Sequence, residues 1–362
     1  MMFKRTLILL GLMGLPLWAT VTMEQKIGQM LMVGFHGTTA EKDTQICREI
    51  KEYHLGAVIL FDYNPVDKSK PKNIATKSQV AKLTRQLQAC SYDGKLLIAV
   101  DQEGGRVQRL KQKYGFYGQF PKASDVIKMD EHQIKKTYTK MSKELKSVGI
   151  NFDLAPVADL DINQNNHVIH GLGRSFGKDP KIVSKYASVF IDAMHANGVL
   201  TSLKHFPGHG SSEGDTHKGY VDVTHLWSKV ELEPYHILKD KADTVMVAHV
   251  FNKNLDAKYP ATLSAKTVDG LLRKKLGFKG VVITDDLQMG AIAKKYTLSK
   301  TLELSINAGD DILLIGNQLD PKHIVNTKTL IDTIVSLVKK GSIKIDRIEK
   351  SYHRIQKLKE KL

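Results

Sequence analysis

The segment KHFPGHGSSEGDTHKG, residues 204–219, places titratable side chains among glycines directly after the apolar run VLTSL. Asp215 and His217 stand two positions apart, close enough for a carboxylate to hold an imidazole and raise its pKa. Such a pair can exchange a proton near neutral pH, which is the task of a general acid/base. This density of titratable groups favours a catalytic loop over an ordinary solvated connection, although glycine and serine also form such connections.

A metal site is an alternative for the same segment, because His205 and His209 are four positions apart. That spacing puts two ligands on one face of a helix, but Pro207 and the neighbouring glycines prevent a helix there. Asp215 and His217 could still bind a metal from a loop, yet no further ligands follow at a recognisable spacing. We therefore predict neither a metal nor a cofactor.

Carboxylates also follow the apolar run VVIT, in the segment TDDLQM. Asp285, at the end of this run, could serve as a nucleophile held rigidly by its strand. Its neighbour Asp286 would support the nucleophile or have a structural role. A helix N-cap suits Asp286 better than Asp285, because DDLQMGAIAKKY reads as the opening of a helix.

A third group of polar side chains lies in VDQEGGRVQRL, where Asp101, Arg106 and Arg109 supply one acceptor and two forked donors. This combination commonly grips sugar hydroxyls or a carboxylate, although either arginine could instead form a structural ion pair.

These residues must be positioned by eight short apolar runs that alternate with amphipathic stretches. Near-continuous apolar runs are typical of strands buried on both faces of a parallel sheet. The pattern predicts a single (β/α)8 barrel over residues 21–362, closed by two C-terminal helices, with a doubly wound open sheet as the alternative. The runs are QMLMVGF, GAVILF, KLLIAV, INFDLAPVA, VLTSLKHF, DTVMVAHV, GVVITDDL and DILLIG.

In a barrel of this kind the active site lies at the C-terminal ends of the strands. The third predicted strand runs into Asp101, the fifth into Lys204 and His205, the sixth into His249 and the seventh into Asp285. We expect His249 to face the substrate together with the other polar groups. This placement predicts an enzyme.

The first 20 residues predict a secretory signal peptide. Lys4 and Arg5 precede an apolar run from about Leu7 to Trp18, followed by the small residue Ala19. An uncleaved membrane anchor or a buried N-terminal helix is the alternative, because Leu17 occupies a position that usually holds a small residue. We expect an exported protein, periplasmic or secreted, with no stable membrane span once the signal is removed.

The composition is that of a globular protein, with 42% hydrophobic and 25% charged residues. The formal charge is +16, or +14 when the two charges of Lys4 and Arg5 are subtracted, which favours anionic neighbours such as cell-wall polymers. Because no base-stacking aromatic motif interleaves the lysines, we predict no nucleic-acid partner. Cys47 and Cys90 could form a disulfide after export or remain as two thiols.

Around the candidate site residues named above, the sequence resembles the glycoside hydrolase family 3 β-N-acetylglucosaminidases of the single-domain, cell-wall-recycling type. The resemblance extends from about Thr22 to the C-terminal helices. It rests on six ordered motifs: DQEGGRVQRL, FDLAPVADLD, GLGRSFGKDP, KHFPGHG followed by DTH, VMVAHV and ITDDLQM.

The resemblance implies a retaining exo-β-N-acetylglucosaminidase (a β-N-acetylhexosaminidase) whose nucleophile is Asp285. It further implies that His217, oriented by Asp215, is the acid/base on a mobile loop whose glycines provide backbone freedom. The terminal N-acetylglucosamine would be held by Lys204, His205, Asp101, Arg109 and Arg174.

The expected substrates are N-acetylglucosamine-containing glycans, either peptidoglycan fragments (muropeptides) or chito-oligosaccharides, acted on by a monomer. Two other functions are left open. A phosphorylase would use phosphate in place of water, because a neutral imidazole base does not repel an anionic nucleophile. A non-catalytic peptidoglycan-binding protein would use the basic surface alone.

Overall fold

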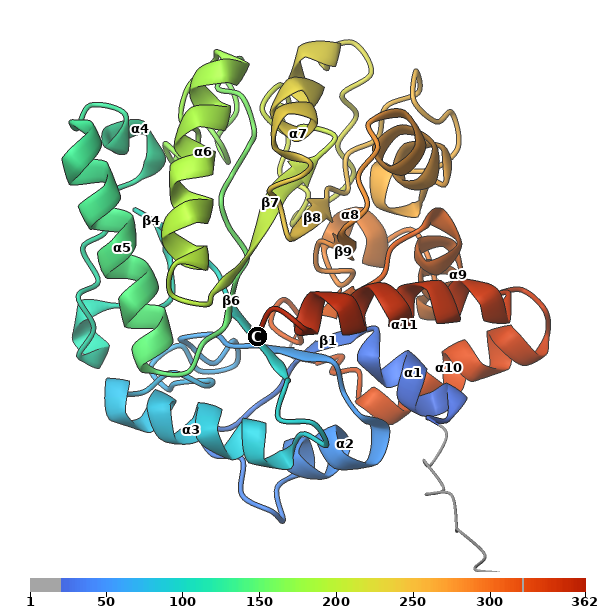
Figure 1. Ribbon diagram of the computed structural model, residues 1–362. Coiled ribbons are helices and arrows are strands. Elements are labelled where there is room, and N and C mark those ends of the chain that lie inside the picture. The colour runs from blue at the N-terminus through green and yellow to red at the C-terminus, as the bar shows by residue number, and fades with distance from the viewer. Residues whose placement is uncertain (1–20, 321) are drawn as a thin grey trace, which may run out of the picture.

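The structure is a computed structural model and describes residues 21–320 and 322–362 (Figure 1). The predicted signal peptide, residues 1–20, lies outside the described residues. Within the part that the structure describes, no helix is long and apolar enough to cross a membrane.

Eight parallel strands form the central sheet in the order β10-β1-β2-β3-β6-β7-β8-β9. A parallel bridge between Ile283 and Ile312 joins β9 to the residue before β10, so that the two edges of the sheet meet. The sheet is a nearly closed barrel, which confirms the predicted (β/α)8 fold over the open sheet. The strands are β1 (Leu31–Gly34), β2 (Ala57–Ile59), β3 (Leu97–Val100), β6 (Phe152–Asp153), β7 (Leu200–Phe206), β8 (Thr244–Val247), β9 (Val281–Thr284) and β10 (Leu313–Ile315).

The barrel strands coincide with the eight apolar runs because each strand is buried on both faces. All seven residues of β7 and all four of β9 are buried, since one face fills the barrel and the other contacts the helices. The fourth run forms only the short strand β6, but a bridge from Val157 to Lys204 continues its pairing with β7. These two strands therefore stay aligned up to the end where Lys204 lies.

Helices surround the barrel and begin at residues typical of N-caps, such as Thr44, Thr76 and Asp179, whose side chains accept backbone N–H groups. The α-helices are α1 (Met23–Gln29), α2 (Gln45–Tyr53), α3 (Lys77–Cys90), α4 (Ala123–Val126), α5 (Glu131–Ser147), α6 (Pro180–His195), α7 (Glu233–Leu238), α8 (Gly290–Ala293), α9 (Leu298–Ala308), α10 (Thr327–Lys339) and α11 (Ile345–Lys359). The 3₁₀ helices are η1 (Gln112–Tyr114), η2 (Lys229–Leu232) and η3 (Ala261–Leu263), and η4 (Lys266–Lys275) is a π-helix.

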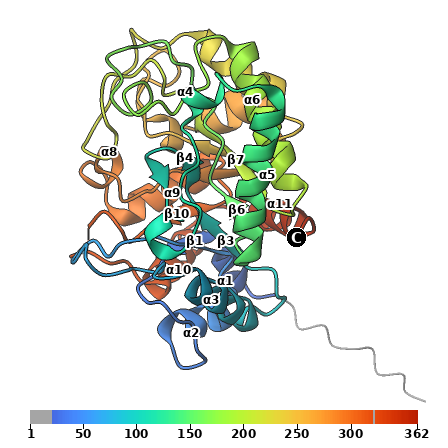
Figure 2. The ribbon, with the colours of Figure 1, turned by 90° about the vertical axis from the view of Figure 1, so that its left-hand side faces the viewer.

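The two ends of the barrel differ in what covers them. The closing helices α10 and α11 pack against α1, so that the blue and red ends of the described chain lie side by side (Figure 1). In the side view, α8 lies at the left of the barrel and α11 at the right (Figure 2). Because α8 follows the C-terminal end of β9, the polar strand ends open on the side opposite α11.

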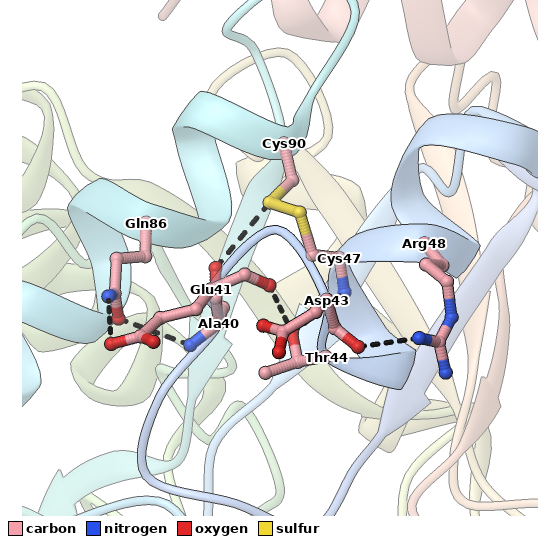
Figure 3. The surroundings of a disulfide bond; sticks show 8 residues. All are labelled: Ala40, Glu41, Asp43, Thr44, Cys47, Arg48, Gln86 and Cys90. Atoms are coloured by element: carbon pink, nitrogen blue, oxygen red, sulfur yellow. Dashed lines mark hydrogen bonds between the residues drawn. A yellow bond between two sulfur atoms is a disulfide. The ribbon is translucent and has the colours of Figure 1, made fainter.

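Cys47, in α2, and Cys90, at the end of α3, form a disulfide with their Cα atoms 5.3 Å apart (Figure 3). The sequence left open whether these cysteines pair. The structure answers that question, because α2 and α3 pack against each other and bring the two side chains together.

Candidate active site

A pocket of about 560 Å³ opens at the C-terminal ends of the strands. Its size is in the range of small-molecule sites. Of the ten predicted site residues, eight line it: Asp101, Arg109, Arg174, Lys204, His205, Asp215, His217 and Asp285.

Charged side chains from β7 and from the connections after β3 and β6 interlock at one wall of the pocket. Lys204 Nζ donates to Asp101 Oδ1 at 3.1 Å and lies 2.6 Å from Glu103 Oε1. Arg174 donates to both oxygens of Glu103, at 2.8 and 2.7 Å, and Arg109 donates to Asp101 Oδ2 at 3.2 Å. This alternation of positive and negative groups holds several donors and acceptors at fixed positions, as sugar recognition requires.

Glu103, which lies behind this wall and holds Lys204 and Arg174, was not predicted from the sequence. Burial acts to raise its pKa, but Arg174 and Lys204 outweigh burial and bring the pKa to about 2. Burial acts to lower the pKa of Lys204, but Glu103 and Asp101 outweigh burial and raise this pKa above its usual value. The acidic residue inside DQEGG was the available signal, but a sequence does not show that one carboxylate contacts two basic side chains from distant segments.

His205 is held by a second missed residue, Asp159, which lies in the motif FDLAPVADLD. His205 Nδ1 lies 2.6 Å from Asp159 Oδ2, and the backbone N–H of His209 donates to Asp159 Oδ1 at 2.8 Å. Burial acts to raise the pKa of Asp159, but His205 outweighs burial and the pKa lies below its usual value. An ionised Asp159 orients the imidazole with Nδ1–H toward itself, which turns Nε2 toward the pocket.

Asp285 directly follows β9 and reaches the pocket from the opposite side of the barrel from Asp101. Its Oδ1 accepts the backbone N–H of Asp286 at 2.8 Å. Burial acts to raise its pKa, but the nearby His249, His205 and His217 outweigh burial and keep the pKa below its usual value. Asp285 is therefore an ionised carboxylate at neutral pH, the state that a nucleophile needs.

Asp286 is a structural group, as predicted, but it is not the predicted helix N-cap. The cap residue of α8 is Met289, whose side chain makes no capping hydrogen bond. The Asp286 carboxylate instead accepts the backbone N–H groups of Gln288, at 3.0 Å, and Gly316, at 3.2 Å. Asp286 thus ties the turn after β9 to the end of β10. It cannot cap α8, because three further residues precede the start of that helix.

His249 lies beneath the pocket and not on its wall, in contrast to our expectation. It is fully buried, Nδ1 lies 2.9 Å from Thr262 Oγ1, and Nε2 donates to the backbone carbonyl of Asp286 at 2.9 Å. Burial lowers its pKa. His249 therefore supports the turn that carries Asp285.

Arg106 is the other predicted residue that the structure does not bring to the pocket. After β3 the chain forms a hairpin of β4 (Gln102–Gly104) and β5 (Val107–Gln108), paired antiparallel. Arg106 lies at the turn of this hairpin and is exposed. Arg109, beyond the turn, returns to the pocket, and this separates the two arginines that the sequence places close together.

The loop after β7 contains the Asp215–His217 pair predicted from spacing. His217 Nδ1 lies 2.9 Å from Asp215 Oδ1, which also accepts the His217 backbone N–H at 3.0 Å. Burial acts to raise the pKa of Asp215, but these two hydrogen bonds outweigh burial and lower it. Because Asp215 is ionised, Nδ1 carries the proton that it donates, and Nε2 is available toward the pocket.

The two histidines that suggested a metal site contact other side chains. Across residues 21–320 and 322–362, no group of three or more His, Cys, Asp or Glu side chains is arranged to hold a metal ion. His205 contacts Asp159, and His209 Nδ1 lies 2.7 Å from Ser212 Oγ, so the two histidines are held by other partners.

The family model "Glycosyl hydrolase family 3 N terminal domain" matches residues 22–358. The chain belongs to glycosyl hydrolase family 3. This membership confirms the family that the six motifs predict and, with it, the enzyme class of glycoside hydrolases.

Two proteins that are similar to this chain are named β-hexosaminidases. The chain is 33% identical to a β-hexosaminidase A from Pseudoalteromonas piscicida over 94% of its own length, but spans only 62% of that relative. It is 32% identical to a β-hexosaminidase from Xylella fastidiosa strain 9a5c, with 79% of this chain and 83% of that protein covered.

Two solved structures have the same fold. A family 3 β-N-acetylglucosaminidase from a Paenibacillus strain matches with a TM-score of 0.82 and 33% identity, over 94% of this chain and 62% of that one. A β-N-acetylhexosaminidase from Beutenbergia cavernae matches with a TM-score of 0.82 and 30% identity, over 94% and 99% of the two chains.

Proposed function

We propose that this chain is a retaining exo-β-N-acetylglucosaminidase with Asp285 as nucleophile and His217, oriented by Asp215, as general acid/base. The observation that supports this assignment best is that one pocket is lined both by an ionised carboxylate at a strand end and by a hydrogen-bonded Asp–His pair. The names of the similar proteins support N-acetylglucosamine as the sugar.

In the first step Asp285 attacks the anomeric carbon through an oxocarbenium-like transition state. A bond forms between its carboxylate oxygen and that carbon while the glycosidic C–O bond breaks. Protonated His217 transfers its Nε2 proton to the leaving oxygen, so the aglycone departs as a neutral alcohol. The ionised Asp215 stabilises the imidazolium that donates this proton.

In the second step water replaces the aglycone. Neutral His217 accepts a proton from this water, whose oxygen attacks the anomeric carbon and displaces Asp285. Two displacements give net retention of configuration. An imidazole in place of a second carboxylate avoids placing another negative charge near the nucleophile, and Asp215 lies on the far side of the ring.

The charged wall of Asp101, Lys204 and Arg174 would hold the hydroxyl groups of the terminal sugar, because its donors and acceptors point into the same pocket as Asp285. Its side chains are fixed by mutual ion pairs, so little rearrangement is needed when substrate binds.

We further propose that the natural substrates are peptidoglycan fragments or chito-oligosaccharides outside the cytoplasm. The formal charge of +16 would favour muropeptides with free carboxylates, and the Cys47–Cys90 disulfide is of the type that persists in oxidising compartments. Fractionation of cells that express the full chain would test export. Incubation with muropeptides and with chito-oligosaccharides, followed by product analysis, would identify the preferred aglycone.

The nucleophile is tested with Asp285→Gly and an aryl β-N-acetylglucosaminide. We expect the variant to lose at least about 10³-fold in kcat, and azide to restore turnover with formation of the α-glycosyl azide, because the small anion replaces the missing carboxylate. Asp240→Asn, at an exposed acid distant from the pocket lining, is the matched control. Full activity of Asp285→Gly without azide would refute the assignment.

The acid/base is tested with His217→Gly and two leaving groups. The variant should retain the first step with a dinitrophenyl glycoside, whose leaving group needs no proton, and lose it with chitobiose. Added azide should then give the β-glycosyl azide, with retained configuration. Equal loss on both substrates would contradict this role for His217.

The phosphorylase alternative rests on the same imidazole, and product analysis decides it. Turnover in the presence of phosphate should give free N-acetylglucosamine if water is the acceptor. Accumulation of the sugar 1-phosphate would identify a phosphorylase, and absence of any turnover of chitobiose by the purified protein would favour the non-catalytic alternative.

A further inference from the structure

The loop that contains the Asp215–His217 pair rests on the first turn of α8. The backbone N–H of Gly290 donates to the carbonyl oxygen of His217 at 3.1 Å, and that of Ala291 donates to Thr216 O at 3.1 Å. Lys294 Nζ donates to Lys218 O at 2.8 Å. Three consecutive carbonyl groups of the loop are therefore held by one short helix.

This contact is possible because residue 290 is a glycine. An ideal Cβ placed on Gly290 would lie 2.8 Å from His217 O and 2.9 Å from both the C and the O atom of Lys218. All three are backbone atoms, so no side-chain rotation relieves the overlap. Any other residue at 290 would push the loop away from α8.

Position 290 is otherwise favourable for a side chain. Gly290 is the first residue of α8 and has no positive φ, so its backbone conformation is open to any L-residue. In a helix, glycine is less favourable than alanine by about 1 kcal/mol. The loop contact is thus the feature of the structure that explains a glycine here.

The helix that receives the loop is tied to the proposed nucleophile. α8 begins five positions after Asp285, and the intervening turn is held by the Asp286 carboxylate and by His249. Displacement of the loop from α8 would therefore change the position of His217 relative to Asp285.

The other end of the loop is anchored independently. The Glu231 carboxylate accepts the backbone N–H groups of Gly210, at 3.1 Å, and Ser211, at 3.3 Å, and Asn166 donates to His209 O at 2.8 Å. These contacts hold the base of the loop but end before Asp215. The side chain of His217 is 51% exposed, so its packing contributes little to its position. What holds it is the contact with Asp215, which belongs to the same loop, and the contact of the loop backbone with α8.

We propose that Gly290 is a positioning residue for the acid/base: the absence of a side chain lets α8 dock the Thr216–Lys218 carbonyls and so sets His217 at the correct distance from Asp285. This inference rests on the proposed function. It assigns to Gly290 no contact with substrate.

The test compares Gly290→Ala with Gly219→Ala, a matched control in the loop itself, directly after Lys218, where an added Cβ meets nothing within 4 Å. We expect Gly290→Ala to lower kcat on chitobiose by about 30-fold, a fraction of the 10²- to 10⁴-fold of general acid catalysis, with KM nearly unchanged. On the dinitrophenyl glycoside the first step should fall by less than about 3-fold. Gly219→Ala should behave as the wild type on both.

An equal loss on both substrates would mean that Gly290→Ala disturbs the pocket as a whole and would overturn the proposal, as would unchanged kcat on chitobiose. If Gly290→Ala does not fold, Lys294→Met decides the question, because it removes only the contact with Lys218 O. It should lower kcat on chitobiose selectively, by about 3-fold, and the same loss on both substrates would refute positioning.

The inference can fail separately from the proposed function. If His217→Gly shows the expected dependence on the leaving group but neither Gly290→Ala nor Lys294→Met does, only the role of Gly290 is wrong. If His217→Gly shows no such dependence, the acid/base assignment itself fails.

Discussion

Glu103→Gln is the most informative perturbation of the charged wall, because the carboxylate joins Lys204 and Arg174 inside the protein. The ordinary pKa of 4.5 falls to about 2 in the folded chain, since the two cations outweigh burial. A shift of this size corresponds to about 3 kcal/mol of folding free energy at neutral pH. Breaking a buried ion pair by removing one partner costs about 3–5 kcal/mol, so the two estimates agree.

Urea unfolding at pH 7 measures this loss. Glu131→Gln is the matched control, because Glu131 forms an exposed pair with Lys135 at 2.9 Å on α5, and removal of such an exposed pair should change the free energy of unfolding little. The Glu103 contribution is present above pH 4.5 and is lost as the pH falls toward 2, so the gap between wild type and Glu103→Gln should narrow over that range. A loss no larger than that of Glu131→Gln, or one independent of pH, would refute this reasoning.

Three further predictions concern the disulfide, a buried acid and the two arginines. Replacing Cys47 and Cys90 together by alanine should destabilise the chain by about 4 kcal/mol in urea unfolding, because the bond closes a loop of sequence separation 43; a loss under about 1 kcal/mol would contradict the loop argument. Burial raises the pKa of Glu231 from 4.5 to about 7. As the pH rises from 4.5 to 8, the free energy of unfolding of the wild type should therefore fall by up to about 3 kcal/mol relative to that of Glu231→Gln. Parallel curves of unfolding free energy against pH would disprove this pKa. Arg109→Ala should raise KM for an aryl N-acetylglucosaminide at least about 10-fold while Arg106→Ala leaves it within about 2-fold, and similar KM values would show that the exposed arginine also binds substrate.

The barrel could be predicted from sequence because its strands are buried on both faces. This requirement leaves an apolar run at every strand, and polar residues can follow only where a run ends. Asp101, Lys204 and Asp285 therefore stand out at strand ends, and a parallel barrel brings all strand ends to one side. The Asp215–His217 contact was predictable for a simpler reason, since two positions of separation place the side chains within hydrogen-bonding distance.

The partners of these residues could not be predicted in the same way. Glu103 and Asp159 make contacts with residues that lie 71 and 46 positions away, and sequence spacing contains no information on such pairs. Arg106 and Arg109 are three positions apart, yet the hairpin turn sends one to solvent and the other into the pocket.

The sequence by itself determined the order of the strands and helices, the residues at the strand ends and the local Asp–His pair, because these follow from periodicity and short spacing. Only the tertiary structure decided that His249 supports the pocket from beneath, that Cys47 bonds to Cys90, and that α8 receives the loop of His217. Each of these depends on segments distant in the chain being packed to within hydrogen-bonding or bonding distance. That proximity is set by the closure of the barrel and by the packing of its helices.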